Sequence, residues 1–98
     1  MIYAFDFDGT LDNFHVQNFC MKLRKSGNEI WVVTMRKDNE YNYNLMKPVL
    51  DKMYLSKSSV IFCDGKPKSD FLEGIRADVY IDNIDKELDI IAKYTERE

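Results

Sequence analysis

Two aspartates two residues apart, Asp6 and Asp8, close an apolar run at the start of the chain and are followed at once by Gly9 and Thr10. On a strand, residues i and i+2 point to the same side, so the two carboxylates are expected to converge just beyond the carboxyl end of the strand. Like charges that close repel each other unless a cation neutralises them. Because carboxylate oxygens suit Mg²⁺, the pattern indicates a magnesium site. The alternative is an ordinary solvated turn, in which Asp and Gly are common.

The stretch 2–12 resembles the first motif of the haloacid dehalogenase superfamily of phosphatases and phosphotransferases, in which apolar residues precede Asp-x-Asp-Gly-Thr. The resemblance implies that Asp6 is a nucleophile that forms an aspartyl-phosphate. It also implies that Asp8 is the general acid that protonates the leaving oxygen and later activates water, and that its carbonyl binds the metal. Gly9 permits a tight turn, and the N–H groups of Gly9 and Thr10 can face phosphate oxygens.

Further residues resemble the second and third motifs of this family. Thr34 closes the apolar run 30–34, so the resemblance implies that its hydroxyl holds the transferring phosphate. Arg36 can reach the substrate phosphate as a fork-shaped donor, with a solvated surface arginine as the alternative. The third motif is a lysine that offsets negative charge, and both Lys66 and Lys68 are candidates. We favour Lys66, because it stands in a Lys-Pro pair of the kind that many family members carry; the other is then a surface lysine.

The fourth motif is an acid that ends the last strand and completes the metal shell. Asp82 resembles it, and here it is followed by Asn83 and then Asp85, whereas many family members carry two acids. Asn83 can bind a metal through its side-chain carbonyl. Asp85 either compensates for the missing second acid or favours the N-terminus of the last helix, where a negative charge is favourable, and we prefer the second interpretation. The metal ligands that the resemblance implies are therefore Asp6, Asp8, Asp82 and Asn83, with Mg²⁺ as the cofactor.

Four short apolar runs alternate with helical patterns along the chain. This alternation predicts an α/β fold, a three-layer Rossmann-like core in which helices cover both faces of a parallel sheet of about four strands. The resemblance adds the strand order 4-1-2-3. In such sheets ligands bind beyond the carboxyl ends of the strands, and each of the four expected strands has polar or ionisable residues there. The expected strands span 2–7, 30–34, 60–63 and 79–81; the expected helices span 14–26, 45–54 (Pro48 in its first turn), 69–75 (Ser69 as N-cap) and 84–94, and 36–44 is left unassigned.

The family often carries a cap domain that covers the substrate, but too few residues separate the expected elements for one here. Residues 1–98 are therefore expected to form a single, capless domain with an open site. An open site suits a phosphorylated macromolecular end, or a homo-oligomer in which a neighbouring copy acts as the lid. A phosphorylated small molecule is the other substrate class.

Composition narrows the classes of partner. The chain has 98 residues, 45% of them hydrophobic and 32% charged, which is ordinary for a soluble protein. A net charge of −3 gives no electrostatic signature of nucleic-acid binding or of attraction to an anionic membrane. The longest apolar run is too short for a membrane span, and no signal peptide precedes the first strand. A cytoplasmic protein is therefore expected, with Cys20 and Cys63 as buried thiols in a reducing compartment; a disulfide between them is the alternative, and the fold does not need it.

The leading hypothesis from the sequence is a Mg²⁺-dependent phosphatase, a haloacid-dehalogenase-like hydrolase that acts through Asp6 on a phosphomonoester. The alternative is a binding or regulatory module that keeps the fold without turnover, which the reduced fourth motif and the short chain favour. A phosphoacceptor signalling domain ranks third. Such domains carry an acidic pair after the first strand and the acceptor at the end of the third, and the third expected strand here ends in Cys63-Asp64, with no acidic pair that matches this scheme. The fold does not fix the substrate.

Overall fold

Four parallel strands form the central sheet of the protein, in the order β3-β2-β1-β4. The computed structural model describes residues 1–82, so Asn83 and the expected helix 84–94 lie outside the described residues. The α/β class, the parallel sheet and the strand order predicted from the sequence are confirmed. The strands are β1 (Ile2–Phe5), β2 (Glu29–Thr34), β3 (Val60–Phe62) and β4 (Val79–Ile81).

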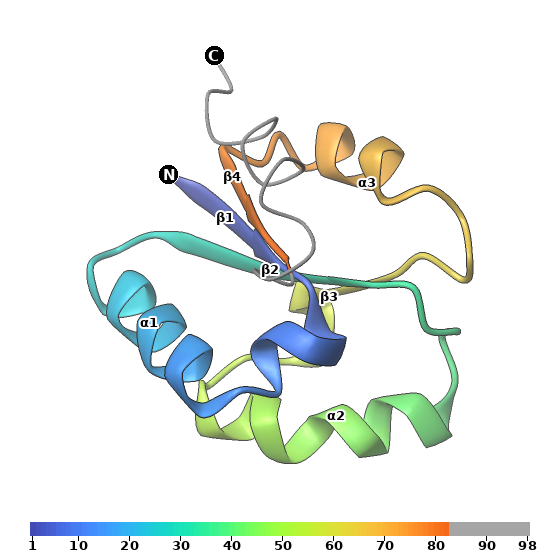
Figure 1. Ribbon diagram of the computed structural model, residues 1–98, viewed down its shortest axis with the longest axis horizontal. Helices are drawn as coiled ribbons and strands as arrows, with labels where there is room; N and C mark the ends of the chain where they lie inside the picture. The colour runs from blue at the N-terminus through green and yellow to red at the C-terminus, as the bar shows by residue number, and fades with distance from the viewer. Residues whose placement is uncertain (83–98) are drawn as a thin grey trace.

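Helices cover both faces of the sheet (Figure 1). The helices α1 (Phe14–Lys25) and α2 (Glu40–Lys52) lie on one face, and α3 (Lys68–Gly74) lies on the other. Two short helical turns complete the description: η1 (Phe7–Leu11) directly follows β1, and η2 (Lys57–Ser59) directly precedes β3. Within residues 1–82, none of the helices combines the length and the apolar character that a membrane span requires.

Alternation along the strands divides the core into two layers. Phe5 and Val32 pack with residues of α1 and α2, whereas their neighbours Ala4 and Val33 pack with Leu72 of α3. Because side chains two residues apart on a strand share a face, the position two after Ala4 is aimed at the α3 side of the sheet. Asp6 occupies that position.

The first strand is shorter than the sequence pattern predicts. β1 ends at Phe5, and the chain turns into η1, in which Gly9 has a φ of 77° that suits glycine. The turn is closed by hydrogen bonds from the Leu11 N–H to the Asp6 carbonyl (3.2 Å) and from the Asp12 N–H to the Phe7 carbonyl (3.3 Å). The expectation of a strand over 2–7 is therefore wrong at its carboxyl end.

The second helix begins earlier than expected, because an asparagine caps it. Asn39 accepts a hydrogen bond from the Asn42 N–H (2.8 Å), which satisfies one of the free donors at the helix start. Pro48 therefore lies inside α2 and not in its first turn. Proline removes one helical hydrogen bond to the residue four before it. Both Pro48 and Asn44 are exposed, so water can satisfy the carbonyl that is left.

The third helix also begins differently. α3 starts at Lys68, with Pro67 at the N-cap and no capping bond from a side chain. The expectation that Ser69 caps this helix is therefore wrong. Pro67 holds a φ of −57°, and a proline ring fixes φ near this value, so the helix can begin directly after it. Lys68 consequently belongs to the first turn of α3.

Cys20 and Cys63 are both buried free thiols, as the sequence indicated. Burial raises the pKa of Cys20 to about 12, and it also raises the pKa of Cys63. Buried thiols of raised pKa carry little of the reactive thiolate at neutral pH.

The helices α1, α2 and α3 all end in the same hydrogen-bonded motif. After α3, the Ala77 N–H donates to the Leu72 carbonyl (3.1 Å) and the Arg76 N–H to the Glu73 carbonyl (3.1 Å), which is the Schellman pattern. The residue after the C-cap adopts a positive φ in this motif and is usually glycine. α1 follows that rule, whereas α2 and α3 do not. The three residues at this position are Gly27 (89°), Tyr54 (58°) and Arg76 (57°).

Replacing Arg76 with glycine is expected to stabilise the protein by about 0.5–1 kcal/mol. The left-handed backbone costs a non-glycine residue about 1–2 kcal/mol, and the greater entropy of unfolded glycine offsets part of this gain. Urea unfolding measures the difference. The control is Lys25→Gly in the last turn of α1, which should destabilise by about 1 kcal/mol. A loss of stability in Arg76→Gly would contradict the prediction.

Candidate active site at the carboxyl edge of the sheet

The first and last strands bring two carboxylates side by side. β1 and β4 pair in parallel with Phe5 opposite Ile81, and the next residues along are Asp6 and Asp82. The Asp6 N–H donates to the Ile81 carbonyl (2.9 Å), which extends the pairing by one residue. Thr34 ends β2 on the other side of β1. The carboxyl edge of the sheet therefore gathers these residues, as the sequence predicted.

One ammonium group from α3 connects the two acids. The Nζ of Lys68 forms an ion pair with Asp6 and lies 3.8 Å from the Oδ2 of Asp82. It also donates to the hydroxyl of Tyr80 (2.9 Å), and that hydroxyl in turn donates to Asp82 (2.6 Å). The side chains of the three charged residues are only 11–17% exposed. The result is a nearly buried cluster with two carboxylates and one cation among its charges.

Among the described residues, this cluster holds two carboxylates and the one ammonium group of Lys68. Burial raises the pKa of Asp6 to about 6, and the negative charge of Asp82 and the side-chain hydrogen bond between the two acids act in the same direction. Lys68 opposes these effects through its hydrogen bond and its charge but does not cancel them. A second cation at the carboxylates would stabilise the ionised form of Asp6.

The two carboxylates suit Mg²⁺ better than a metal whose ligands must all come from the protein. No group of three or more His, Cys, Asp or Glu side chains in residues 1–82 could hold a metal ion. Mg²⁺ needs only one or two carboxylates, with water and substrate oxygens supplying the rest. Asp6 and Asp82 are such a pair, and two carboxylates placed together suit a divalent cation. We therefore find the residues present compatible with Mg²⁺.

Asp8 is placed differently from the expectation that it converges with Asp6. It lies in η1, not on the strand, and the groups that shift the pKa of Asp6 are Lys68 and Asp82. The carboxylate of Asp8 instead binds the guanidinium of Arg36, with Nε to Oδ2 at 2.9 Å and Nη2 to Oδ1 at 2.8 Å. The continuous strand on which the expected convergence depended is not present, because β1 ends at Phe5.

The Asp8–Arg36 pair is held in turn by α2. The Nη1 of Arg36 donates to the Oδ1 of Asn42 (2.8 Å), and Asn42 donates to the carbonyl of Lys37 (3.0 Å). The hydrogen bond between the Arg36 guanidinium and Asp8, together with the negative charge of Asp8, raises the pKa of Arg36. The first turn of α2 therefore fixes the guanidinium on Asp8. The sequence pattern did not predict this contact between Asn42 and Arg36.

The Gly9 N–H is not an open donor in this conformation. The Gly9 N–H donates to the Oδ2 of Asp12 (3.2 Å), a residue that the sequence gave no part in the site. The side chain of Thr10 is buried, and its hydroxyl has no hydrogen-bond partner among the described residues. The expected contact of the Gly9 N–H with phosphate would require this hydrogen bond to Asp12 to break.

Hydrogen bonds join the loop after β2 to the loop after β3. The Cys63 N–H donates to the Thr34 carbonyl (2.7 Å), and the Gly65 N–H donates to the Met35 carbonyl (3.1 Å). The Thr34 hydroxyl is buried and accepts a hydrogen bond from the Arg36 N–H (3.2 Å). A hydroxyl that accepts one bond keeps its own hydrogen to donate. This network fixes Thr34 at the edge of the sheet.

The structure distinguishes between the two candidate lysines. Lys68 contacts Asp6, whereas Lys66 is exposed and its side chain makes no hydrogen bond or ion pair within residues 1–82. The sequence-based preference for Lys66 therefore does not agree with the geometry. The sequence analysis did not name Tyr80 as a site residue. Tyr80 lies on β4 two residues before Asp82, and this spacing places the two side chains on the same side of the sheet.

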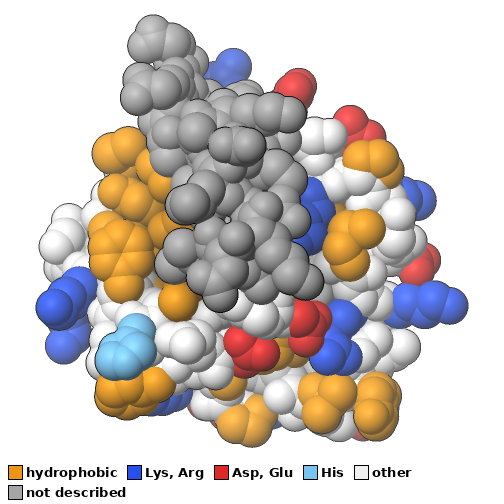
Figure 2. All heavy atoms as spheres, in the orientation of Figure 1, with side chains coloured by type: hydrophobic (Ala, Val, Ile, Leu, Met, Phe, Trp, Pro, Cys, Tyr) orange, Lys and Arg blue, Asp and Glu red, His pale blue; other side chains and the backbone are white. Residues whose placement is uncertain are grey.

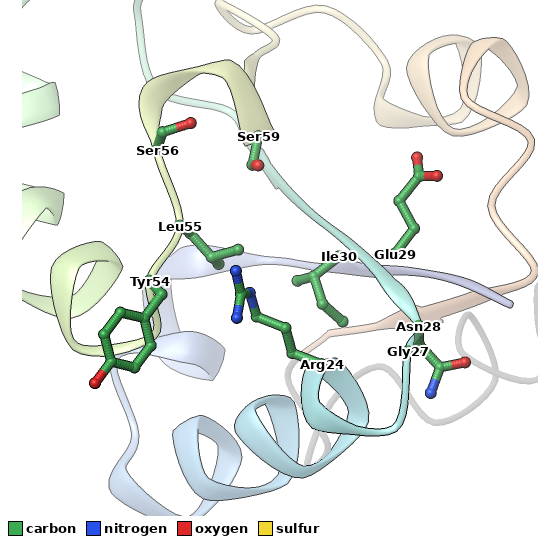
Figure 3. Close-up of a pocket in the computed structure, with 9 residues that line it drawn as sticks. All are labelled: Arg24, Gly27, Asn28, Glu29, Ile30, Tyr54, Leu55, Ser56 and Ser59. Atoms are coloured by element: carbon green, nitrogen blue, oxygen red, sulfur yellow. The ribbon is translucent and has the colours of Figure 1, made fainter.

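A hollow of about 510 Å³ lies away from these residues, at the opposite edge of the sheet. The end of α1, the first residues of β2 and the segment after α2 line it, and Figure 3 shows Arg24 pointing into it while Glu29 points away. It lacks paired acids and a lysine, so the cluster around Asp6 is the better candidate for chemistry. On the visible part of the face in Figure 2, acidic and basic side chains are interspersed and form no continuous basic surface.

Comparison with known proteins adds no assignment: no protein family, no curated protein and no solved structure matches the chain.

Proposed function

We propose that the protein is a Mg²⁺-dependent phosphohydrolase that cleaves a phosphomonoester through an aspartyl-phosphate on Asp6. The observation that carries the proposal is the buried cluster of Asp6, Lys68 and Asp82 at the carboxyl edge of the sheet. A nucleophile of this kind needs positive charge nearby to hold the phosphate oxygens. The resemblance of the stretch 2–12 to a phosphatase motif supports the same chemistry.

In the proposed reaction, an oxygen of Asp6 attacks the phosphorus and the bond from phosphorus to the ester oxygen breaks. Asp8 gives its proton to the leaving oxygen and becomes a carboxylate. In the second half, Asp8 takes a proton from water, the water oxygen attacks the phosphorus, and the acyl-phosphate bond breaks to release phosphate and Asp6. Lys68 offsets the negative charge that gathers on Asp6 and the phosphate.

Arg36 has a defined part in this scheme. Its guanidinium holds Asp8 in the structure, and a fork-shaped donor matches phosphate as well as carboxylate. When a substrate phosphate approaches, the guanidinium can pass to it and free Asp8 for proton transfer. The hydroxyl of Thr34, fixed at the end of β2, supplies a further donor.

Asp6 and Asp82 would hold Mg²⁺, with the Asp8 carbonyl as the third protein ligand. Bound there, the cation would neutralise charge on the phosphate oxygens and on the two acids. Water and the substrate would complete its coordination.

The purified protein with Mg²⁺ should release phosphate from a generic aryl phosphate such as p-nitrophenyl phosphate. Chelation with EDTA should lower the rate at least roughly tenfold, and added Mg²⁺ should restore it. A colorimetric phosphate assay measures both results. A panel of phosphorylated metabolites, nucleotides and phosphopeptides, tested in the same assay, then identifies the substrate class. Turnover that is unchanged by chelation would contradict the metal requirement.

A catalytically silent module of the same fold is the second candidate, and the Asp8–Arg36 pair is the observation that favours it. A general acid that stays ion-paired cannot transfer a proton. If the protein binds Mg²⁺ but releases no phosphate from any member of the panel, the silent module is the better description.

A further inference from the structure

Tyr80 lies among apolar residues, yet its hydroxyl makes polar contacts. The side chain is 2% exposed and packs with Ala4, Val33 and Leu72 in the layer between the sheet and α3. Phenylalanine would fill the same space. The hydroxyl is the part of the side chain that packing does not explain.

That hydroxyl connects the cation of the cluster to one of its acids. It accepts a hydrogen bond from the Nζ of Lys68 (2.9 Å) and donates one to Oδ2 of Asp82 (2.6 Å). A hydrogen bond to one oxygen restricts the rotation of a carboxylate. Groups that restrain metal-binding carboxylates in this way are a common part of metal sites.

We propose that Tyr80 is a positioning residue that orients the carboxylate of Asp82 for a divalent cation and holds Lys68 beside Asp6. The inference rests on the proposed function, because it takes Asp82 as a ligand of Mg²⁺. It extends that function to a residue outside the sequence motifs that indicated it. Tyr80 itself touches neither substrate nor metal in this scheme.

The test is the affinity for Mg²⁺ without substrate, measured by isothermal titration calorimetry on the full chain. Tyr80→Phe keeps the ring and removes the hydroxyl, so the dissociation constant should rise about 10–100-fold. The matched control is Tyr3→Phe on β1, whose hydroxyl contacts only the sulfur of Met1 (3.9 Å) among residues 1–82. Tyr3→Phe should bind Mg²⁺ like the unaltered protein. Circular dichroism and thermal melting verify that each variant is folded.

An unchanged Mg²⁺ affinity in Tyr80→Phe would overturn the inference and leave the proposed function standing. An unaltered protein that binds no Mg²⁺ at millimolar concentration would overturn both, and the phosphate-release assay then shows whether any turnover exists without the metal. If Tyr80→Phe does not fold, the Mg²⁺ affinity of Lys68→Met is compared with that of the double variant Lys68→Met/Tyr80→Phe. The double variant removes both the ammonium group and the hydroxyl that bond to each other, so neither is left buried without the other. A further tenfold loss of affinity in the double variant supports the role of the hydroxyl, and equal affinities contradict it.

Discussion

Replacing Asp6 with asparagine is expected to lower the rate of phosphate release by at least roughly 10⁴-fold, the scale seen when a nucleophile is removed from an enzyme. Asparagine has the shape of aspartate, but its amide oxygen is a poor nucleophile and carries no charge. The ion pair with Lys68 is lost, although Lys68 keeps its contacts with Tyr80 and Asp82. The variant should therefore fold and bind substrate while failing in the chemical step.

A direct observation of the covalent intermediate separates this prediction from a general loss of function. Acid quenching of the unaltered protein during turnover of a ³²P-labelled substrate should leave label on the chain, and hydroxylamine should remove it because acyl phosphates are labile to this nucleophile. Asp6→Asn should carry no label. The control is Asp51→Asn at the end of α2, an exposed residue paired only with Lys47 among the described residues. Turnover in Asp6→Asn equal to that of the control would exclude Asp6 as the nucleophile.

The fold was predictable because its signals are local and repeated. Four apolar runs separated by helical patterns are typical of a parallel sheet, and parallel strands place all of their carboxyl ends at one edge. The position of Asp6, Thr34 and Asp82 at that edge therefore followed from the order of the elements. Each of these residues directly follows or ends a strand.

The errors arose where a turn or a cap overrides the pattern. The sequence analysis continued the strand to residue 7 and its alternation to Asp8, but β1 ends at Phe5 and Gly9 allows the chain to curl into η1, which contains Asp8. In the same way, the Asn39 cap extends α2 toward β2 and brings Asn42 to Arg36. Contacts of this kind depend on loop geometry, which periodicity does not encode.

The choice between the two lysines depended on a single residue of helix register. Side chains on a helix tilt toward its N-terminus, so a lysine in the first turn of α3 can reach back over the edge of the sheet. Lys68 has that position, because α3 begins directly after Pro67. Lys66 precedes the helix in an exposed turn. The sequence analysis took Ser69 as the cap and therefore placed Lys68 outside the helix. From that position, the direction of the Lys68 side chain toward the edge of the sheet could not be inferred.

The two lysines therefore offer a matched pair of variants. Lys68→Met is expected to lower kcat/KM for phosphate release by about 10²–10³-fold, the usual effect of removing one preorganised charge or donor from an active site. Methionine keeps most of the length of the side chain and removes the charge that offsets Asp6. Lys66→Met, at an exposed position two residues away, should stay within about twofold of the unaltered protein, since surface substitutions rarely reach a site.

Stability and activity should separate in these two variants. Without Lys68, Asp6 and Asp82 are left nearly buried without their shared cation, and the removal of one partner from such a pair is destabilising. Since the pKa of Asp6 is already raised to about 6, this carboxyl can relieve the repulsion by taking up a proton, which limits the loss of stability but removes the nucleophile. The rate should consequently fall further than the melting temperature suggests. A larger loss of activity in Lys66→Met than in Lys68→Met would show that the exposed lysine serves the site, and the geometry of the buried cluster would then not be that of the working enzyme.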